Sequence, residues 1–387
     1  IRDSGCIMTL IPKKGLAAQR EKELEEKLEA YRSSLSEEQL DAMVEKTKAL
    51  EAYQEAGEDP KALECIPMLK RSDIKKEAAK IVNEELTVDN SLFLYHDVCT
   101  NGIGYVDLMF KTDSIAPEQI PYLGLLKSVL GYVDTEHYTY GELFNEINAN
   151  TGGINCGVEV FDRADSTEEF QAMFSVRGKA LYTKMDFLFK MIGEILNSSK
   201  LEDTKRLYEI VASVKSRAQV NLTGAGHSTA VLRAAAYSSP MAAFQDEMAG
   251  IGYYQFIEKL EKDFEQRKEE TVEELCKLMK KILRPENFMI SYTGERESLE
   301  TVQKLAGTVK AGLGTEPVEK SKEKLTCTKK NEGFKTSGQV QYVAQTGNFK
   351  KKGLEYTGAL EILKVILSYD YLWMNLRVKG GAYGCMS

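Results

Sequence analysis

The feature that most constrains the fold is a repeated change of hydrophobic period between residues 91 and 310. Runs such as "IGYVDLMFKT" and "FQAMFSVRGKAL" alternate apolar and polar residues, as strands do when one face is buried. Longer stretches near 182–197 and 202–222 repeat apolar residues at helical spacing. Pairs of strands separated by pairs of helices predict an α+β fold, in which helices cover one face of a single sheet.

Local signals place further elements within this region. Asn101-Gly102 lies between two strand-like runs and predicts a β-hairpin. Thr139 and Glu142 have the spacing of a helix cap, so we expect a helix over 140–150. The other expected elements are a helix at 117–131, strands at "GINCGVEVF" and "NFMISYTG", a helical region through about 281, and a last helix after "GERESLE".

The region before residue 91 has a different character. "CIMTLIPKKG" predicts a short strand over Ile7 to Ile11, and two helical patterns follow, separated by a capping box at Ser36–Gln39. Their apolar stripes are narrow and their other faces are rich in Glu and Lys, so we expect a long helical hairpin that serves as a strut or linker. A coiled coil that binds a partner is the alternative.

The C-terminal region begins with a Lys-, Glu- and Thr-rich stretch without periodicity, which predicts an interdomain linker. A strand-like "GQVQYVAQTG" and the helical "TGALEILKVILSYDYLWMNLRV" come next, and too few residues remain to complete a second unit like 91–310. We therefore expect a chain that is cut at both ends. The predicted organisation is 1–15, the last strand of a missing upstream domain; 16–60, the hairpin; 61–90, a linker; 91–310, an α+β domain; 311–332, a linker; and 333–387, the start of a truncated homologous domain.

Composition excludes several classes of function. The 51 basic and 59 acidic side chains are interleaved, with a net charge of −8, so no basic surface for nucleic acid or anionic lipid is expected. No apolar run approaches the length of about 20 residues that spans a bilayer. The seven cysteines are scattered without a C-x-x-C pair, which favours reduced thiols in a cytosol-like compartment.

The chain shows no obvious catalytic centre of its own. His96, His137 and His227 are far apart in sequence, and none belongs to a pair that would place two metal ligands on one helix face. The glycines in "TNGIGYVD" and "NTGGINCG" lack the spacing of a phosphate-binding loop. No metal site is therefore predicted within these residues.

The stretch "LRVKGGAYG" offers the best candidate site. The guanidinium of Arg377 can donate hydrogen bonds to carbonyl oxygens, and the phenol of Tyr383 can donate to an oxyanion without deprotonation. Gly380 and Gly381 let the backbone turn tightly or approach a ligand. This combination suits binding of a peptide backbone, although a helix end with a Gly-Gly turn is the plainer interpretation.

Several stretches, in order along the chain, resemble the C-terminal half of pitrilysin/insulinase-type zinc metallopeptidases of the presequence-protease branch. Residues 9–55 resemble the helical hairpin that joins the two halves of those enzymes. The stretches "LYHDVCTNGIGYVDLMF", "ELFNEINANTGGI", "GHSTAVLRAAAYSSP" and "GIGYYQF" resemble their third domain, and "RVKGGAYG" resembles the Arg/Tyr motif of their fourth.

The resemblance implies a function. Such enzymes are zinc-dependent oligopeptidases in which two halves close over a chamber, and zinc is bound in the first half by an H-x-x-E-H motif. It implies that Arg377 and Tyr383 contact substrate and that Gly380 and Gly381 shape their loop. At the counterpart of the zinc helix, "PYLGLL", Tyr122, Leu125 and Leu126 stand where ligands and base would be. This half would therefore hold no zinc and be inactive alone.

The expected partners are unstructured peptide substrates and the N-terminal half of the same polypeptide, with no nucleic acid and no membrane. The expected location is a bacterial-type cytoplasm, or an organelle matrix. The alternative is a catalytically inactive binding or assembly subunit of the same fold. An H-x-x-E-H motif encoded upstream of Ile1 would discriminate the two hypotheses.

Overall fold

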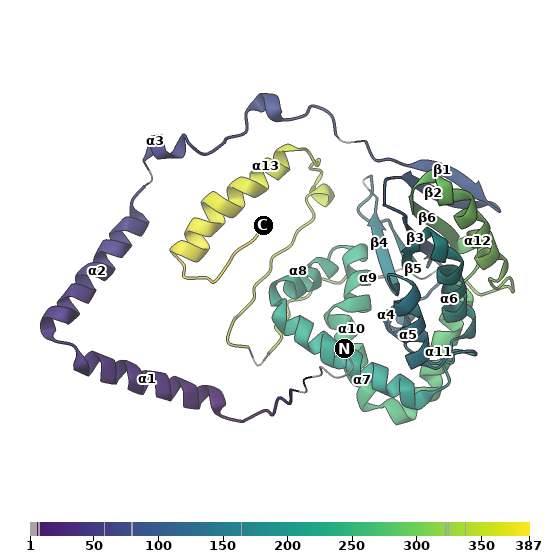
Figure 1. The fold of residues 1–387 in the computed structure, drawn as a ribbon, viewed down its shortest axis with the longest axis horizontal. Coiled ribbons are helices and arrows are strands. Elements are labelled where there is room, and N and C mark those ends of the chain that lie inside the picture. The colour runs from purple at the N-terminus through teal and green to yellow at the C-terminus, as the bar shows by residue number, and fades with distance from the viewer. Residues whose placement is uncertain are drawn as a thin grey trace. The chain divides into compact units, whose positions relative to one another are not determined.

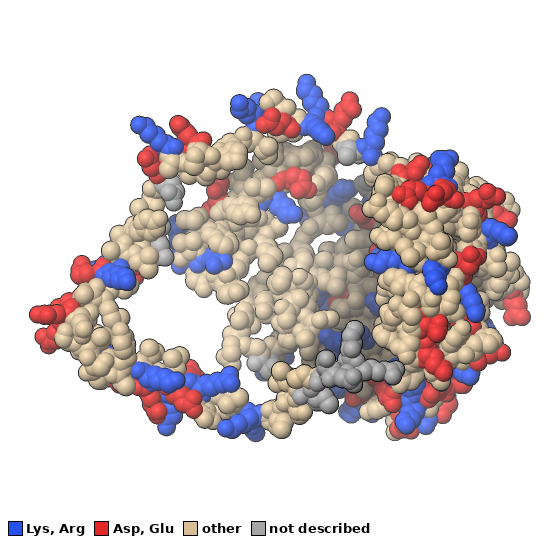
Figure 2. Space-filling view, in the orientation of Figure 1, with Lys and Arg blue, Asp and Glu red and all other residues tan. Residues whose placement is uncertain are grey.

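The computed structural model describes residues 6, 8–57, 59–78, 80–163, 165–321, 323, 325–336 and 338–387, with the backbone alone at residues 54 and 55. The chain divides into two units, Ile1–Lys80 and Ile81–Ser387, which are described separately (Figure 1). No described helix is both long enough and apolar enough to traverse a bilayer. On the face shown in Figure 2, basic and acidic side chains of the described residues are interspersed.

The first unit contains the two predicted helices, α1 (Leu16–Ser34) and α2 (Glu37–Glu55), followed by the short α3 (Pro60–Leu63). The capping box is confirmed, since the Gln39 amide donates to the Ser36 hydroxyl and the Ser36 amide donates to the Gln39 side chain. Leu24 and Leu28 of the apolar stripe remain more than half exposed. The two helices therefore form without burying their stripe.

The strand expected at Ile7–Ile11 is not found in its described part. Residue 7 lies outside the described residues, and Met8 to Ile11 form no strand and are exposed. An extended segment becomes a strand only when a neighbour takes up its backbone hydrogen bonds, and no described segment of the chain does so here.

The second unit is built on one six-stranded sheet with the order β1-β2-β6-β3-β5-β4. Only the β2–β6 pair is parallel, and the other pairs are antiparallel. The strands are β1 (Glu84–Val88), β2 (Ser91–Asp97), β3 (Ile103–Lys111), β4 (Ile154–Asp162), β5 (Phe170–Leu181) and β6 (Phe288–Gly294).

The predicted hairpin between β2 and β3 is wrong. Asn101 and Gly102 do form a turn with φ values of 52° and 80°, but β6 lies between the two strands. Ile290 pairs with Phe93 on one side and with Leu108 on the other. A strand that arrives almost 200 residues later leaves no local signal, so the turn alone suggested a direct pairing.

The predicted linker 61–90 also needs correction, because it contains strand β1. Asp89 and Asn90, with φ values of 48° and 64°, form a two-residue turn of the I′ kind that joins β1 to β2. Val88 consequently pairs with Ser91 across the turn. The α+β unit therefore begins near residue 84 instead of 91.

Helices cover one face of the sheet, as predicted. Alternate residues of β3, among them Leu108 and Phe110, are fully buried in the core, whereas Tyr105 is 42% exposed. α6 packs against β5 and α12 against β6. The helices of this unit before residue 312 are α4 (Ile120–Val129), α5 (Tyr140–Asn150), α6 (Met185–Ser198), α7 (Thr204–Gly224), α8 (Gly226–Ala236), α9 (Pro240–Ala249), α10 (Ile251–Lys262), α11 (Phe264–Ile282) and α12 (Leu299–Ala311).

The described residues after α12 contain a helix but no strand. The run Gly338–Gly347, expected as a strand, is extended without a strand partner, and Val343 is 85% exposed. The expected helix forms as α13 (Ala359–Ile366) and continues as a π-helix over Leu367–Val378. Both segments lack buried residues, so 333–387 has no core of its own here, and a fourth domain stays a prediction.

Candidate functional site

The predicted substrate-binding residues lie at the C-terminal end of the π-helix. Gly381 adopts a left-handed conformation with φ of 72°, its amide donates to the Arg377 carbonyl (2.9 Å), and the Ala382 amide donates to the Leu376 carbonyl (3.0 Å). These bonds terminate the helix in the manner of a left-handed glycine cap. The helix-end interpretation of the two glycines is thus realised in the backbone.

Gly380 serves the same helix end in a different way. A Cβ atom at this position would lie 2.6 Å from the Leu376 carbonyl oxygen and 3.0 Å from that of Asn375. Glycine is therefore required by close approach of the chain to itself. The backbone geometry explains both glycines without a ligand.

The side chains of Arg377 and Tyr383 are not accounted for by the helix end. The Arg377 guanidinium stacks on the indole of Trp373 with 4.1 Å between guanidinium carbon and ring centroid. Tyr383 is 92% exposed. Among the described residues neither side chain has a hydrogen-bond or ion-pair partner, and the two do not contact each other. Both are free to donate to an external acceptor.

The expected counterpart of the zinc helix is α4, and its three indicated residues are core residues. Tyr122, Leu125 and Leu126 are 6%, 0% and 1% exposed. Tyr122 packs edge-on against the ring of Phe256 on α10. This surface of α4 is therefore filled by packing.

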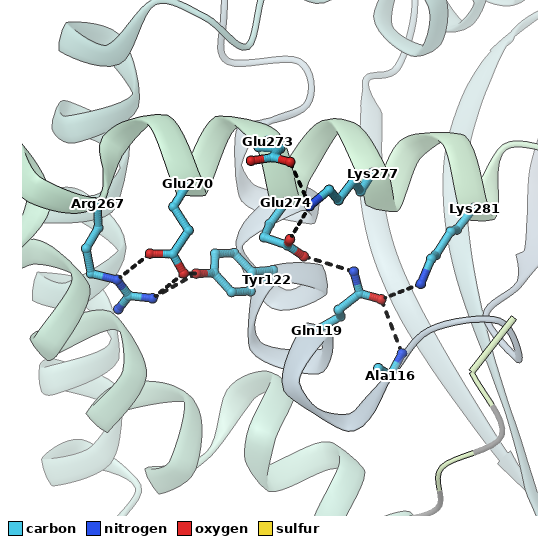
Figure 3. A network of polar contacts seen from close by, with 9 residues as sticks. All are labelled: Ala116, Gln119, Tyr122, Arg267, Glu270, Glu273, Glu274, Lys277 and Lys281. Carbon is cyan, nitrogen blue, oxygen red and sulfur yellow. Dashed lines mark hydrogen bonds and ion pairs between the residues drawn. The ribbon is translucent and has the colours of Figure 1, made fainter. Parts of the chain in front are cut away.

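The polar end of Tyr122 is engaged by α11 (Figure 3). Its hydroxyl donates to Glu270 (3.1 Å) and accepts from Arg267 (2.9 Å), and Arg267 also binds Glu270 directly (3.1 Å). Burial raises the pKa of Tyr122 to about 12, so the phenol stays protonated and can donate. The hydrogen bond from Arg267 lowers the pKa of Glu270, which remains an anion paired with a cation.

A second set of contacts joins the start of α4 to α11 (Figure 3). Gln119 donates to Glu274 (2.9 Å) and accepts from Lys281 (3.0 Å), while Lys277 binds Glu274 (3.0 Å). Burial tends to raise the pKa of Glu274, but the hydrogen bonds from Gln119 and Lys277 outweigh it and the pKa is lowered.

Both carboxylates of α11 that face α4 are thus paired with cations and hydrogen-bond donors of the protein. Zinc in proteins is bound by free imidazole, thiolate or carboxylate groups converging at about 2.0–2.3 Å. No group of three or more such side chains with metal-binding geometry occurs among the described residues. The residues around α4 therefore do not fit a zinc ion.

The three histidines are separated in the structure. His96 bonds the Val82 carbonyl (2.7 Å) and the Ser291 hydroxyl (3.2 Å), and His137 pairs with Glu194 (3.0 Å) at the surface. His227 lies in the first turn of α8 and faces the ring of Tyr342. Each has its own partner on a different element.

The structure also contains a buried ion-pair cluster that sequence reasoning missed. Asp246, 1% exposed, accepts from the amides of Ile251 and Gly252 at the start of α10 and from Arg233 of α8 (2.6 Å). Arg233 also binds both oxygens of Glu332, at 2.8 and 3.1 Å. The stretches "GHSTAVLRAAAYSSP" and "GIGYYQF" contain two of these parts, but nothing in either indicates Glu332, which lies 99 residues after Arg233.

Comparison with known proteins identifies the family. The model of the family described as associated with peptidase M16, subgroup C, matches residues 10–260. The chain belongs to this peptidase M16-associated family, and the resemblance to the presequence-protease branch is confirmed.

Its relatives are longer proteins. Protein HypA of Clostridium perfringens is 37% identical over 381 residues, covering 98% of this chain and 39% of that protein. Presequence protease 1, chloroplastic/mitochondrial, of Arabidopsis thaliana is 29% identical over 370 residues, covering 94% of this chain and 34% of that protein. The chain therefore spans less than two fifths of these relatives.

Similar solved structures include the peptidase M16 inactive domain from Pseudomonas fluorescens, with a TM-score of 0.41 and 14% identity over 61% of this chain and 52% of that one. A protease from Helicobacter pylori has a TM-score of 0.44 and 14% identity, covering 63% of this chain and 54% of that one.

Proposed function

We propose that this chain is the C-terminal, non-zinc half of a zinc-dependent oligopeptidase that degrades unstructured peptides in a closed chamber. The observation that carries the proposal is helix α4. It occupies the position expected for a zinc helix, yet Tyr122, Leu125 and Leu126 are buried there and the facing carboxylates of α11 are paired with cations. Membership of the peptidase M16-associated family and relatives named presequence protease support the same assignment.

In this proposal the N-terminal half of the same polypeptide supplies the zinc and the hydrolytic water chemistry. The present chain supplies chamber wall, the hinge helices α1 and α2, and the substrate clamp. Arg377 donates to a carbonyl of the bound peptide, and Tyr383 donates to the oxygen on which negative charge develops. Their lack of partners among the described residues and the exposure of Tyr383 support this role. A bacterial-type cytoplasm or an organelle matrix is the proposed location.

The clamp is tested in the full-length peptidase by Tyr383→Phe. Loss of one donor to a developing oxyanion should lower kcat by about 1–3 kcal/mol of transition-state stabilisation, with a small change in KM. Tyr369→Phe is the matched control, since Tyr369 is an exposed tyrosine of the same helix (70%). Turnover of Tyr383→Phe equal to that of the control would return Tyr383 to a structural role.

A catalytically inactive binding or assembly subunit of the same fold is the second candidate, because the packed α4 suits it equally well. The two candidates differ in what the polypeptide does when both halves are present. Peptide hydrolysis by the complete polypeptide supports the oligopeptidase. Peptide binding without hydrolysis, at saturating zinc, would support the subunit instead.

A further inference from the structure

The stretch "GHSTAVLRAAAYSSP", which the clamp does not use, holds the chain that leads toward that clamp. We call residues 312–358, between α12 and α13, the connecting segment. Its first contact with α8 is at Gly226, where a Cβ atom would overlap the ring of Tyr342. His227 faces the same ring, with 6.3 Å between centroids. The absence of a side chain at Gly226 therefore gives Tyr342 its seat.

The second contact is the two-pronged ion pair between Arg233 and Glu332. Two parallel N–H to oxygen bonds fix both distance and orientation, unlike a single point contact. The Tyr237 hydroxyl donates to the same carboxylate. The hydrogen bond from Arg233 is the main reason that the pKa of Glu332 falls to about 2, so the carboxylate is charged throughout the neutral range.

The third contact follows the C-terminal end of α8. The Lys351 ammonium donates to the Ser238 carbonyl (2.8 Å) and pairs with Glu168 of the β4–β5 loop (2.7 Å). Only residues 352–358 separate Lys351 from α13. Seven extended residues span at most about 25 Å, so the helix that bears Arg377 is held on a short tether.

We propose that Glu332 is a positioning residue, which through Arg233 anchors the connecting segment on α8 and thereby limits where Arg377 and Tyr383 can reach a substrate carbonyl. This inference rests on the proposed function. Glu332 suits such a role because it lies outside any helix or strand, while Arg233 retains its pair with Asp246 when Glu332 is removed. The fold of α8–α10 therefore does not depend on Glu332.

Anchoring is measured first, on the chain itself, by hydrogen exchange of peptides from residues 325–345. Glu332→Ala should raise their exchange rate by about tenfold, as expected for loss of a charge-assisted bidentate contact. Glu319→Ala is the matched control, since Glu319 lies on the same segment and makes no ion pair among the described residues. Equal exchange in the two variants would overturn the inference.

Positioning is measured next by a double-mutant cycle in the full-length peptidase. Glu332→Ala should lower kcat by about tenfold at an unchanged melting temperature, yet have little further effect in the Tyr383→Phe background, because both changes remove the same interaction. Glu332→Gln should show the same pattern in case the alanine variant folds poorly.

The outcomes separate the two claims. A Tyr383→Phe effect with no Glu332→Ala effect, or with effects that multiply fully, overturns the positioning role and leaves the proposed function intact. An inert Tyr383→Phe overturns both the clamp and the positioning that depends on it.

Discussion

Replacing Gly124 by alanine tests whether α4 is held by packing. Gly124 is buried in α4, and a Cβ atom there would meet the Met248 carbonyl oxygen of α9 and lie 2.8 Å from the Tyr253 ring of α10. A backbone oxygen cannot rotate away, so the cost should reach the upper end of the overpacking range, about 3 kcal/mol. Alanine recovers about 1 kcal/mol of helix propensity. The free energy of unfolding should fall by about 2 kcal/mol.

The matched control is Gly193→Ala in α6, where no atom lies within 4 Å of the added Cβ. Here the propensity gain of about 1 kcal/mol is unopposed, so stability should rise. The assay is thermal unfolding of the chain by circular dichroism, with urea midpoints as a second measure. For a unit of this size the shifts should be about −4 to −8 °C for Gly124→Ala and about +2 to +4 °C for Gly193→Ala. A Gly124→Ala chain that melts at or above the wild-type temperature would refute the close packing of α4.

Three further predictions concern single groups. Burial raises the pKa of the Cys156 thiol to about 12, so at pH 8 a thiol reagent should label exposed Cys99 quickly and Cys156 only after denaturation; equal rates would contradict the packing of β4. Because the pKa of Glu332 is lowered from 4.5 to about 2, its contribution is fully present above about pH 4.5 and is lost as the pH falls toward 2. Hydrogen exchange in residues 325–345 should show that loss in the wild type but not in Glu332→Gln. Tyr122→Phe should lower the free energy of unfolding by about 1–2 kcal/mol in urea titrations, since Glu270 and Arg267 still pair directly; no change would mean that the hydroxyl bonds add nothing.

Elements with strong local signals were predictable from the sequence. The cap at Thr139 and Glu142 begins α5 as expected, and the period-2 runs became β4 and β5. In these cases a side-chain hydrogen bond or an alternating pattern acts within a few residues. Short-range physical chemistry is sufficient to specify them.

Features that depend on distant partners were not predictable. The Asn101-Gly102 turn forms, but the position of β6 between β2 and β3 is decided by packing over almost 200 residues. Apolar alternation in Gly338–Gly347 did not produce a strand, because a strand needs a neighbour as well as a pattern.

The site was predictable only in part. That "PYLGLL" lacks metal ligands could be read from its residues, and the structure adds that Glu270 and Glu274 of α11 face it with their charges already paired. Glu332 could not be found, since an acidic residue in a segment rich in Lys and Glu carries no sign of its partner. The roles of Arg377 and Tyr383 stay a prediction.

Zinc stoichiometry tests the central claim most directly. The chain is equilibrated with excess zinc, passed through gel filtration without chelator, and analysed for metal by mass spectrometry, with peptide hydrolysis assayed on the same fractions. Because the side chains around α4 are apolar or already paired, the account predicts no stoichiometric zinc and no hydrolysis. One zinc retained per chain, together with hydrolysis that a chelator abolishes, would contradict it.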